Sequence, residues 1–165
     1  MTLATTLFLG FLLFQRLGEL VLARSNTRRL LAEGATEIGA GHYPLIVALH
    51  AAWLAAIVVT GWDEIVRPGW LFIFALLQVL RIWILATLGR RWTTRIILTD
   101  TPLVTSGPFR WLKHPNYTLV VAEIAVAPLV LGLTWVALIF SLLNAAMLTL
   151  RIRVEEKALR PRRTD

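Results

Sequence analysis

Long runs of apolar residues constrain this chain more than any other feature of its sequence. Residues 2–23, 45–61 and 69–88 each approach the roughly 20 apolar residues that a helix needs to span about 30 Å of hydrocarbon. The whole chain is 57% hydrophobic, with a mean hydropathy of +0.68, which is too apolar for an ordinary soluble domain. These runs predict an integral membrane protein that is built from helices.

The last apolar run, residues 117–150, is too long for one spanning helix. Pro128 and Gly132 interrupt it, which predicts two shorter helices joined near residues 131–134. Residues 151–160 are expected to continue the second of these helices. The sequence therefore predicts an all-α fold with about five transmembrane helices, of which the last two form a helical hairpin.

The distribution of basic residues predicts the orientation in the membrane. Residues 24–44 form a polar connection with three arginines, residues 89–116 carry five Lys or Arg residues, and the tail from residue 151 carries six. With five spans, all three segments fall on one side, which the positive-inside rule makes cytoplasmic. We therefore expect a multi-pass protein of the cell (plasma or inner) membrane, with its N-terminus outside and its C-terminus in the cytoplasm. The net charge of +7 then reflects orientation, and no nucleic-acid partner is expected.

Several kinds of site are excluded by what the sequence lacks. It has no cysteine, so disulfides and thiolate metal sites are absent, and its three histidines lack metal-ligand spacing. We predict no metal site. Neither a Gly-x-Gly-x-x-Gly nor a P-loop pattern is present, which argues against a soluble nucleotide-binding site.

Ionisable residues within the apolar runs require partners. Arg81 and Glu123 both lie inside predicted spans, where an arginine costs at least about 2.5 kcal/mol on insertion scales. Two interpretations stay open: a functional site, or a structural ion pair of Glu123 with Arg16 or Arg81. His50, inside the second span, is expected to form an interhelical hydrogen bond.

Residues 107–117 form an irregular, charged edge beside a membrane span. Pro108 and Pro115 prevent a continuous helix there, and polar irregular backbone at that depth must face protein or a water-filled cavity. Arg151 and Glu155 share a helix face on the expected final helix. Carboxylates and aromatics suit a sulfonium or ammonium cation, and arginines suit an anionic group. The same residues would fit an enzyme that joins a cationic cofactor to a lipid, or a lipid-binding module.

Residues 103–117, Leu-Val-Thr-Ser-Gly-Pro-Phe-Arg-Trp-Leu-Lys-His-Pro-Asn-Tyr, followed by Glu155-Glu156, resemble a known two-part signature. It is the Arg-His-Pro-x-Tyr … Glu-Glu pattern of the isoprenylcysteine carboxyl methyltransferase family. The resemblance covers about residues 78–160. Lys113 replaces the arginine of the motif, Leu119 stands where many members have glycine, and the short tail argues against a prenyl-protein substrate. The first half is similar to a short bacterial branch associated with type III polyketide synthases, whose members O-methylate alkylpyrones or alkylresorcinols.

The resemblance implies a membrane methyltransferase that uses S-adenosyl-L-methionine and O-methylates a lipophilic acceptor, which could be a carboxylate, an enol or a phenol. Arg81 and Arg151 would orient the acceptor oxygen, and Glu123 or His114 would serve as a base for a phenol. One domain, residues 1–165, is expected, with N-terminal helices in 1–70 and the catalytic core in 71–160. The resemblance assigns cofactor binding to Thr101, Pro102, Leu103, Val104, Phe109, His114, Pro115, Asn116, Tyr117, Glu155 and Glu156.

Two alternatives to this function stay open at the level of sequence. The basic loops would also suit a non-catalytic membrane module that binds anionic lipid. Membrane sterol reductases resemble this family's fold in their C-terminal halves, so an NADPH-dependent reductase is the second alternative. As partners we expect a lipophilic small-molecule acceptor and membrane lipids.

Overall fold

Five long helices make up most of the chain, and two short strands lie in the connections at one end of the bundle. The computed structural model describes residues 2–159. The strands β1 and β2 and three short 3-10 turns, η1 to η3, lie in the connections. In chain order the elements are α1 (Leu3–Ala32), β1 (Thr36–Ile38), η1 (Ala40–His42), α2 (Tyr43–Gly61), α3 (Pro68–Leu88), η2 (Gly89–Arg91), β2 (Ile96–Leu98), η3 (Gly107–Arg110), α4 (Pro115–Val130) and α5 (Thr134–Leu159).

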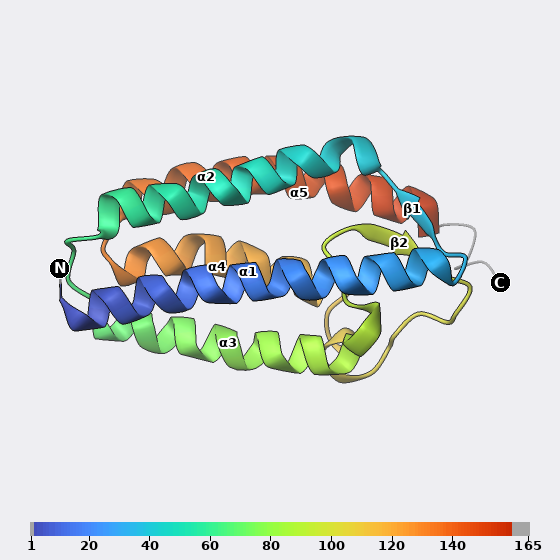
Figure 1. The fold of residues 1–165 in the computed structure, drawn as a ribbon, viewed down its shortest axis with the longest axis horizontal. Helices are drawn as coiled ribbons and strands as arrows, with labels where there is room; N and C mark the ends of the chain where they lie inside the picture. Colours follow the sequence, from blue (N-terminus) through green and yellow to red (C-terminus); the bar gives the residue numbers. More distant parts are fainter. Residues whose placement is uncertain (1, 160–165) are drawn as a thin grey trace.

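The five helices run side by side along the long axis, each in the opposite direction to the one before it in the chain (Figure 1). Helix α4 lies between α3 and the α2–α5 pair, behind α1. Both strands, the loops of residues 89–114 and the end of α5 lie at the end opposite the N-terminus. The three basic segments therefore share one end of the bundle, as five spans require.

Within residues 2–159, four helices are long and apolar enough to cross a membrane by length and composition: α1, α2, α3 and α5. Helix α4 has 16 residues, which at about 1.5 Å per residue cover about 24 Å of the roughly 30 Å of hydrocarbon. It packs against α3 and α5 and buries Leu119, Glu123 and Ala127 among its neighbours, so it does not have to match the full thickness of the lipid. The predicted all-α integral membrane fold is confirmed, and the five expected helices are present.

The predicted end of the first helix was wrong. Helix α1 continues to Ala32, so residues 24–32, the first part of the expected polar connection of residues 24–44, are helical. Ala23, Thr27 and Leu30 are buried and continue one face of the helix at i, i+4 and i+7. The buried Asn26 amide donates to the Trp92 carbonyl at 2.8 Å, which fixes this extension against the loops after α3.

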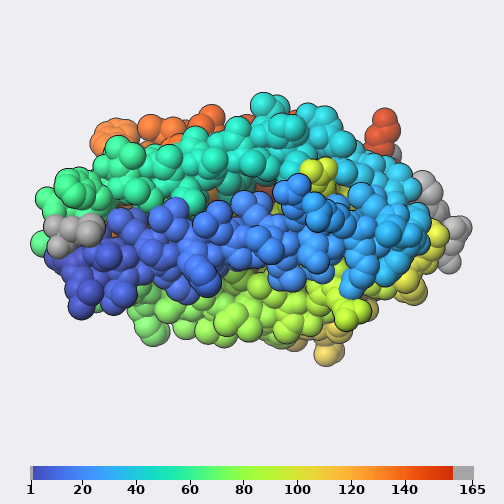
Figure 2. Space-filling view, viewed as in Figure 1, coloured from blue at the N-terminus to red at the C-terminus, as the bar shows by residue number. Residues whose placement is uncertain are grey.

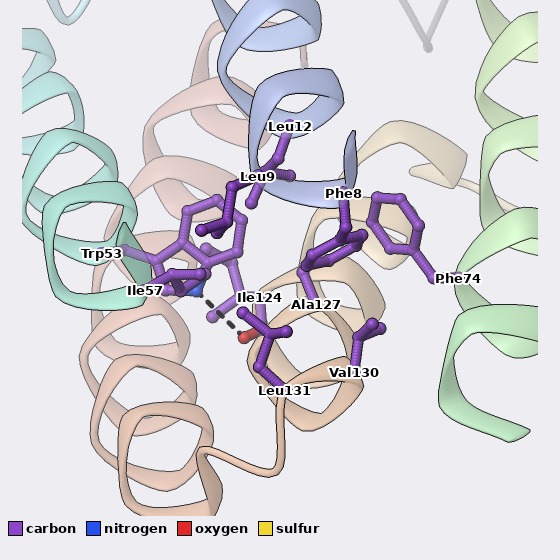
Figure 3. Close-up of a cluster of buried hydrophobic side chains, with 10 residues drawn as sticks. All are labelled: Phe8, Leu9, Leu12, Trp53, Ile57, Phe74, Ile124, Ala127, Val130 and Leu131. Atoms are coloured by element: carbon purple, nitrogen blue, oxygen red, sulfur yellow. Dashed lines mark hydrogen bonds between the residues drawn. The ribbon is translucent and has the colours of Figure 1, made fainter. Parts of the chain in front are cut away.

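Pro128 lies inside the last turn of α4, and the helix continues to Val130 before the predicted joint at residues 131–134. Proline has no N–H, so the carbonyl of Ile124, four residues earlier, has no helical partner. The Trp53 indole of α2 donates to that carbonyl at 3.2 Å (Figure 3). The helix ends at Val130, and Gly132, with a φ of +73°, forms the turn into α5. The predicted hairpin is confirmed.

The main apolar core surrounds this tryptophan in the half of the bundle away from the strands. Phe8 of α1 meets Phe74 of α3 edge to face, with ring centroids 5.4 Å apart (Figure 3). Large side chains from four helices therefore fill this half of the molecule. The buried cluster consists of Phe8, Leu9, Leu12, Trp53, Ile57, Phe74, Ile124, Ala127, Val130 and Leu131.

The two strands, which the sequence analysis did not predict, tie the α1–α2 connection to the loop after α3. They pair antiparallel, with Glu37 opposite Ile97. An ion pair reinforces the pairing, because Arg95 Nη1 lies 2.7 Å from Glu37 Oε1. The Arg95 guanidinium also lies 4.2 Å from the centre of the Tyr43 ring at the start of α2. The first two helices and the 89–114 segment are thus held together at this end.

Candidate active site

A polar cleft lies at the end of the bundle that holds the strands and the long loops. It consists of two adjoining cavities of about 210 and 340 Å³, which share lining residues such as Leu103, Phe109, His114 and Glu155. The structure brings ten of the eleven residues proposed for the cofactor to this cleft. They are Thr101, Pro102, Leu103, Val104, Phe109, His114, Pro115, Asn116, Tyr117 and Glu155.

Glycine and proline shape the backbone that forms one wall of the cleft. Gly107 has a φ of +57°, and a Cβ atom there would lie 2.6 Å from the Thr87 hydroxyl, so only glycine allows this approach to α3. Pro108 is buried in the short 3-10 turn that follows. Pro115 occupies the first turn of α4, where its missing N–H costs nothing. The predicted break in the helix at both prolines is confirmed, and it leaves His114 and its neighbours at the cleft.

Tyr117 links the two polar residues that the end of α5 contributes. Its hydroxyl donates to the Glu155 carboxylate and accepts from Arg151 Nε at 2.9 Å. Arg151 Nη2 donates to the Thr94 carbonyl at 2.6 Å, which fixes α5 to the loop before β2. The Glu155 carboxylate therefore has a defined position in the cleft.

His114 lies on the other side of the same tyrosine, and one of its ring nitrogens makes no hydrogen bond. Its ring stacks on Tyr117, with centroids 5.4 Å apart. Its Nδ1 lies 4.0 Å from the Glu155 carboxylate. Its buried Nε2 lies 3.7 Å from Glu156 Oε1 and makes no hydrogen bond among residues 2–159. A buried polar atom without a partner is costly, so this nitrogen is available to a bound molecule.

Glu156, the eleventh predicted residue, lies outside the cleft lining in the described part of the chain. Its carboxylate pairs with the Lys113 ammonium at the rim, and both side chains are partly exposed. Lys113 itself lines both cavities. The two glutamates of the Glu-Glu pair thus have different surroundings, one within the cleft and one at its edge.

The charged residues inside the bundle form one buried network. Arg81 Nε donates to Glu123 Oε1 at 2.8 Å, and its Nη2 contacts the other carboxylate oxygen. Arg81 Nη1 lies 2.9 Å from Glu19, and Arg16 Nη2 donates to Glu123 at 2.7 Å. The predicted pairing of Glu123 with Arg16 or Arg81 is confirmed, since Glu123 pairs with both. Two arginines and two glutamates make the network neutral as a whole.

Beside this network, an apolar groove opens between α1 and α2. Figure 2 shows the face of the molecule on which these two helices lie, with α1 in blue and α2 in green to cyan. Its volume of about 280 Å³ is near the lower end of the roughly 300–1,000 Å³ typical of ligand sites. Arg16, Leu17 and Leu20 line it from α1, and Arg81 lines it from α3. The fully buried Glu123 lies behind this wall.

The groove and the cleft meet at two residues. Trp92 and Asn116 line both, and the indole Nε1 of Trp92 lies 3.5 Å from the Asn116 amide oxygen. Of the two arginines predicted to orient an acceptor, Arg81 lines the groove and Arg151 lines the cleft. A molecule in the groove and another in the cleft would meet at this boundary.

Most of the groove was not predicted from the sequence. Tyr43 and Thr94, which share a hydrogen bond of 3.0 Å, line it together with Trp92 and His50. His50 does not form the expected interhelical bond, because its Nδ1 is paired with the Ile46 carbonyl of its own helix at 2.8 Å. The only available signal for Tyr43 was its place in the His-Tyr-Pro segment at a predicted membrane entry. Within residues 2–159, no group of three or more His, Cys, Asp or Glu side chains could hold a metal ion.

These features define an integral membrane protein with a polar cleft at one end and an apolar groove that leads to it. Residues 70–161 match the family model of isoprenylcysteine carboxyl methyltransferases. The chain is also 36% identical over 159 residues to the uncharacterized protein YpbQ of Bacillus subtilis (strain 168), covering 93% of this chain and 95% of YpbQ. The chain therefore belongs to the isoprenylcysteine carboxyl methyltransferase family and is a membrane methyltransferase. No solved structure matches it.

Proposed function

We propose that the protein is an S-adenosyl-L-methionine-dependent O-methyltransferase that acts on a lipophilic acceptor at the cytoplasmic face of the cell membrane. The observation that carries the proposal is the meeting of the polar cleft and the apolar groove at Trp92 and Asn116. A transferase needs two adjacent sites of different polarity for a polar donor and a lipophilic acceptor. The basic connections of residues 24–44 and 89–116 lie at the end of the bundle opposite the N-terminus (Figure 1), which supports the cytoplasmic orientation.

The residues of the cleft fit the proposed cofactor. The unpartnered Nε2 of His114 can bond a polar group, and Phe109 offers an aromatic face. The Glu155 carboxylate, held by Tyr117, would attract the positive charge of the cofactor's methionine end. When bound, the cofactor would supply a methyl group on a sulfonium. Leu30 of α1 lines the cleft. This supports a single domain in which the N-terminal helices also contribute residues to the cofactor site.

The groove would hold the apolar tail of the acceptor and direct its oxygen towards Asn116. Most of the rate would come from holding that oxygen and the methyl carbon at attack distance. Arg151, which lines the cleft, would orient the acceptor oxygen. Arg81 and Glu123 would act by fixing the groove wall, because each already uses its side-chain polar atoms on the other and on Arg16 and Glu19.

Calorimetry on the detergent-purified protein tests this proposal. We expect saturable binding of S-adenosyl-L-methionine and none of NADPH. Incubation with the deuteromethyl cofactor and native membrane lipids should then yield a lipid carrying one deuterated methyl group, detected by mass spectrometry.

Each alternative predicts a different outcome of the same measurements. Saturable NADPH binding without binding of S-adenosyl-L-methionine would replace the proposal by a reductase. Binding of neither compound, with binding to phosphatidylglycerol vesicles that is lost in an Arg24→Gln/Arg28→Gln variant, would replace it by an anionic-lipid-binding module. Arg24 and Arg28 suit that test because both residues are exposed.

A further inference from the structure

The turn η3 (Gly107–Arg110) crosses the lipid-facing side of α3. Exposed apolar side chains recur along one face of this candidate span at i, i+4, i+7 and i+11, and they are Phe72, Leu76, Val79 and Trp83. Thr87, one turn after Trp83, continues this stripe. Gly107 packs directly on it, since a Cβ atom there would lie 2.6 Å from the Thr87 hydroxyl and 3.3 Å from the Trp83 indole nitrogen. The turn therefore lies where the lipid-facing surface of α3 ends.

This contact places η3 at the level of the membrane–water interface. Trp83 lies five residues before Leu88, the last residue of α3, which is about 7.5 Å along the helix axis. Tryptophan is enriched at the depth of the lipid headgroups, because its ring is apolar and its N–H needs a polar partner. In Figure 1 the segment before α4, drawn in ochre, lies beside the end of α3. The outer side of η3 therefore faces the headgroup region.

The two sides of this segment have different surroundings. Phe109 and Lys113 line the cofactor cleft. Trp111 and Leu112, which lie between them in the chain, line neither cavity of the cleft and are 75% and 40% exposed. Arg110 is exposed as well, and its guanidinium lies 5.5 Å from the centre of the Trp111 ring. An exposed indole beside a cation suits a lipid surface, where the ring lies among headgroups and the cation faces phosphates.

Backbone hydrogen bonds join the two sides into one unit. The N–H groups of Trp111 and Leu112 both donate to the carbonyl of Pro108, at 3.3 and 3.1 Å. Pro108 is buried and directly precedes Phe109, which belongs to the cleft wall. A displacement of the Trp111 backbone would therefore move the aromatic wall of the cofactor cleft.

We propose that η3, with Trp111 and Leu112, binds the surface of the adjacent anionic phospholipid leaflet, and that this contact holds the wall of the cofactor cleft in place. The Trp111 ring would lie among the headgroups, and Arg110 would face a lipid phosphate. The continuity of η3 with the lipid-facing stripe of α3 and the positive charge of Arg110 favour lipid over a protein partner. The effect on the cleft rests on the proposed function, whereas the contact with lipid does not.

A depth measurement tests the contact itself without any cofactor. The chain has no cysteine, so a nitroxide can be attached to a Leu112→Cys variant in nanodiscs of phosphatidylcholine and phosphatidylglycerol. We expect electron paramagnetic resonance to show that oxygen, which dissolves in the bilayer, reaches this label more readily than a water-soluble nickel chelate. Glu33→Cys is the control, because α1 extends past the end of α3 (Figure 1), and its label should show the reverse preference.

The alternative to lipid contact has its own outcome in this measurement. If the nickel chelate reaches the Leu112→Cys label as readily as the Glu33→Cys label, the turn lies in water, the proposal is overturned, and Trp111 is left as a surface for a protein partner.

Calorimetry in nanodiscs tests the effect on the cleft. Trp111→Ser should weaken binding of S-adenosyl-L-methionine about fivefold, the lower end of typical coupling between two sites. Trp135→Ser is the matched control, since Trp135 is 77% exposed at the start of α5, and it should change the affinity less than about twofold. Equal affinities for the two variants would overturn the role of the membrane in holding the cleft wall.

A measurement on the wild-type protein covers the case in which Trp111→Ser does not fold. The wild type should bind S-adenosyl-L-methionine more tightly in nanodiscs that contain phosphatidylglycerol than in phosphatidylcholine alone. Arg110→Gln should remove this difference, and Arg28→Gln, an exposed arginine of α1, should preserve it. Equal wild-type affinity in both lipids would overturn the effect on the cleft. Absence of binding in every lipid would overturn the proposed function, and the depth measurement would still decide the contact with lipid.

Discussion

Arg81 of α3 and Glu123 of α4 form a two-point ion pair in the interior of the helix bundle. Arg81 Nε donates to one carboxylate oxygen at 2.8 Å, and Nη2 contacts the other. Glu123 is fully buried and also accepts from Arg16 of α1 and from the amide of Gln78. With Arg16, the pair thus connects three helices beside the proposed acceptor groove, and loss of Glu123 would leave two arginines with one carboxylate, that of Glu19.

Glu123→Ala should therefore strongly destabilise the protein. Removing one partner of a buried ion pair typically costs about 3–5 kcal/mol, and without Glu123 one positive charge of the network is uncompensated, because Glu19 alone faces both arginines. Thermal and denaturant unfolding in detergent would measure the loss. Glu33→Ala is the control, since Glu33 pairs with Arg29 at the surface, and it should change stability by no more than about 0.5 kcal/mol. Equal unfolding curves for the two variants would show that the network is not structural.

The helices could be predicted from sequence because hydrocarbon imposes a length and a composition on every span. The runs placed the start and end of α2 and α3 within two residues. The end of α1 was missed because contacts far along the chain, rather than local composition, make it helical. Asn26 and Thr27 are polar in sequence but buried in the structure, and Asn26 reaches Trp92. The only local sign of this longer helix was the helical spacing of Ala23, Thr27 and Leu30, which continues one face of α1.

The candidate site was predictable only in the half that carries a recognisable motif. The residues of the 101–117 segment and Glu155 gather in one cleft. The groove could not be predicted, because its walls come from α1 and α2, and pairs such as Tyr43 with Thr94 join segments 51 residues apart. The charge of Lys113 gave no indication that it would pair with Glu156 at the rim. Such pairings depend on how the helices pack.

Glu155→Gln should weaken binding of S-adenosyl-L-methionine about ten- to a hundredfold. A hydrogen bond to a charged group is worth about 1.5–3 kcal/mol, and the amide removes the charge that faces the cleft. Glu156→Gln is the matched control, because Glu156 pairs with Lys113 at the partly exposed rim, and it should change the affinity less than about threefold. Calorimetric titration of both variants measures the difference. Equal losses would mean that the cofactor uses the two carboxylates alike.

Gly107→Ala should destabilise the cleft wall. A side chain there would adopt a left-handed backbone conformation, which costs about 1–2 kcal/mol, and its Cβ would collide with Thr87. Thermal unfolding should show this loss, and cofactor affinity should fall with it. Gly10→Ala in α1 is the control, because a Cβ there meets nothing within 4 Å, and it should be neutral or stabilising by up to about 1 kcal/mol. A Gly107→Ala protein as stable as Gly10→Ala would contradict the close approach of this turn to α3.

Ala51→Trp should block the acceptor without affecting the cofactor. Ala51 lines the groove between α1 and α2, and a tryptophan there would occupy the space proposed for the acceptor's apolar tail. Each methylene of the tail that can no longer be buried costs about 0.8 kcal/mol, so displacing two or three should lower kcat/KM for para-dodecylphenol about ten- to a hundredfold, while calorimetric affinity for S-adenosyl-L-methionine stays within about twofold. Ala48→Trp, on an exposed part of the same helix outside the groove lining, controls for the added bulk and should leave both quantities unchanged. If the two tryptophan variants turn over the phenol equally, the acceptor reaches Asn116 by a route other than this groove, because only one of them narrows it.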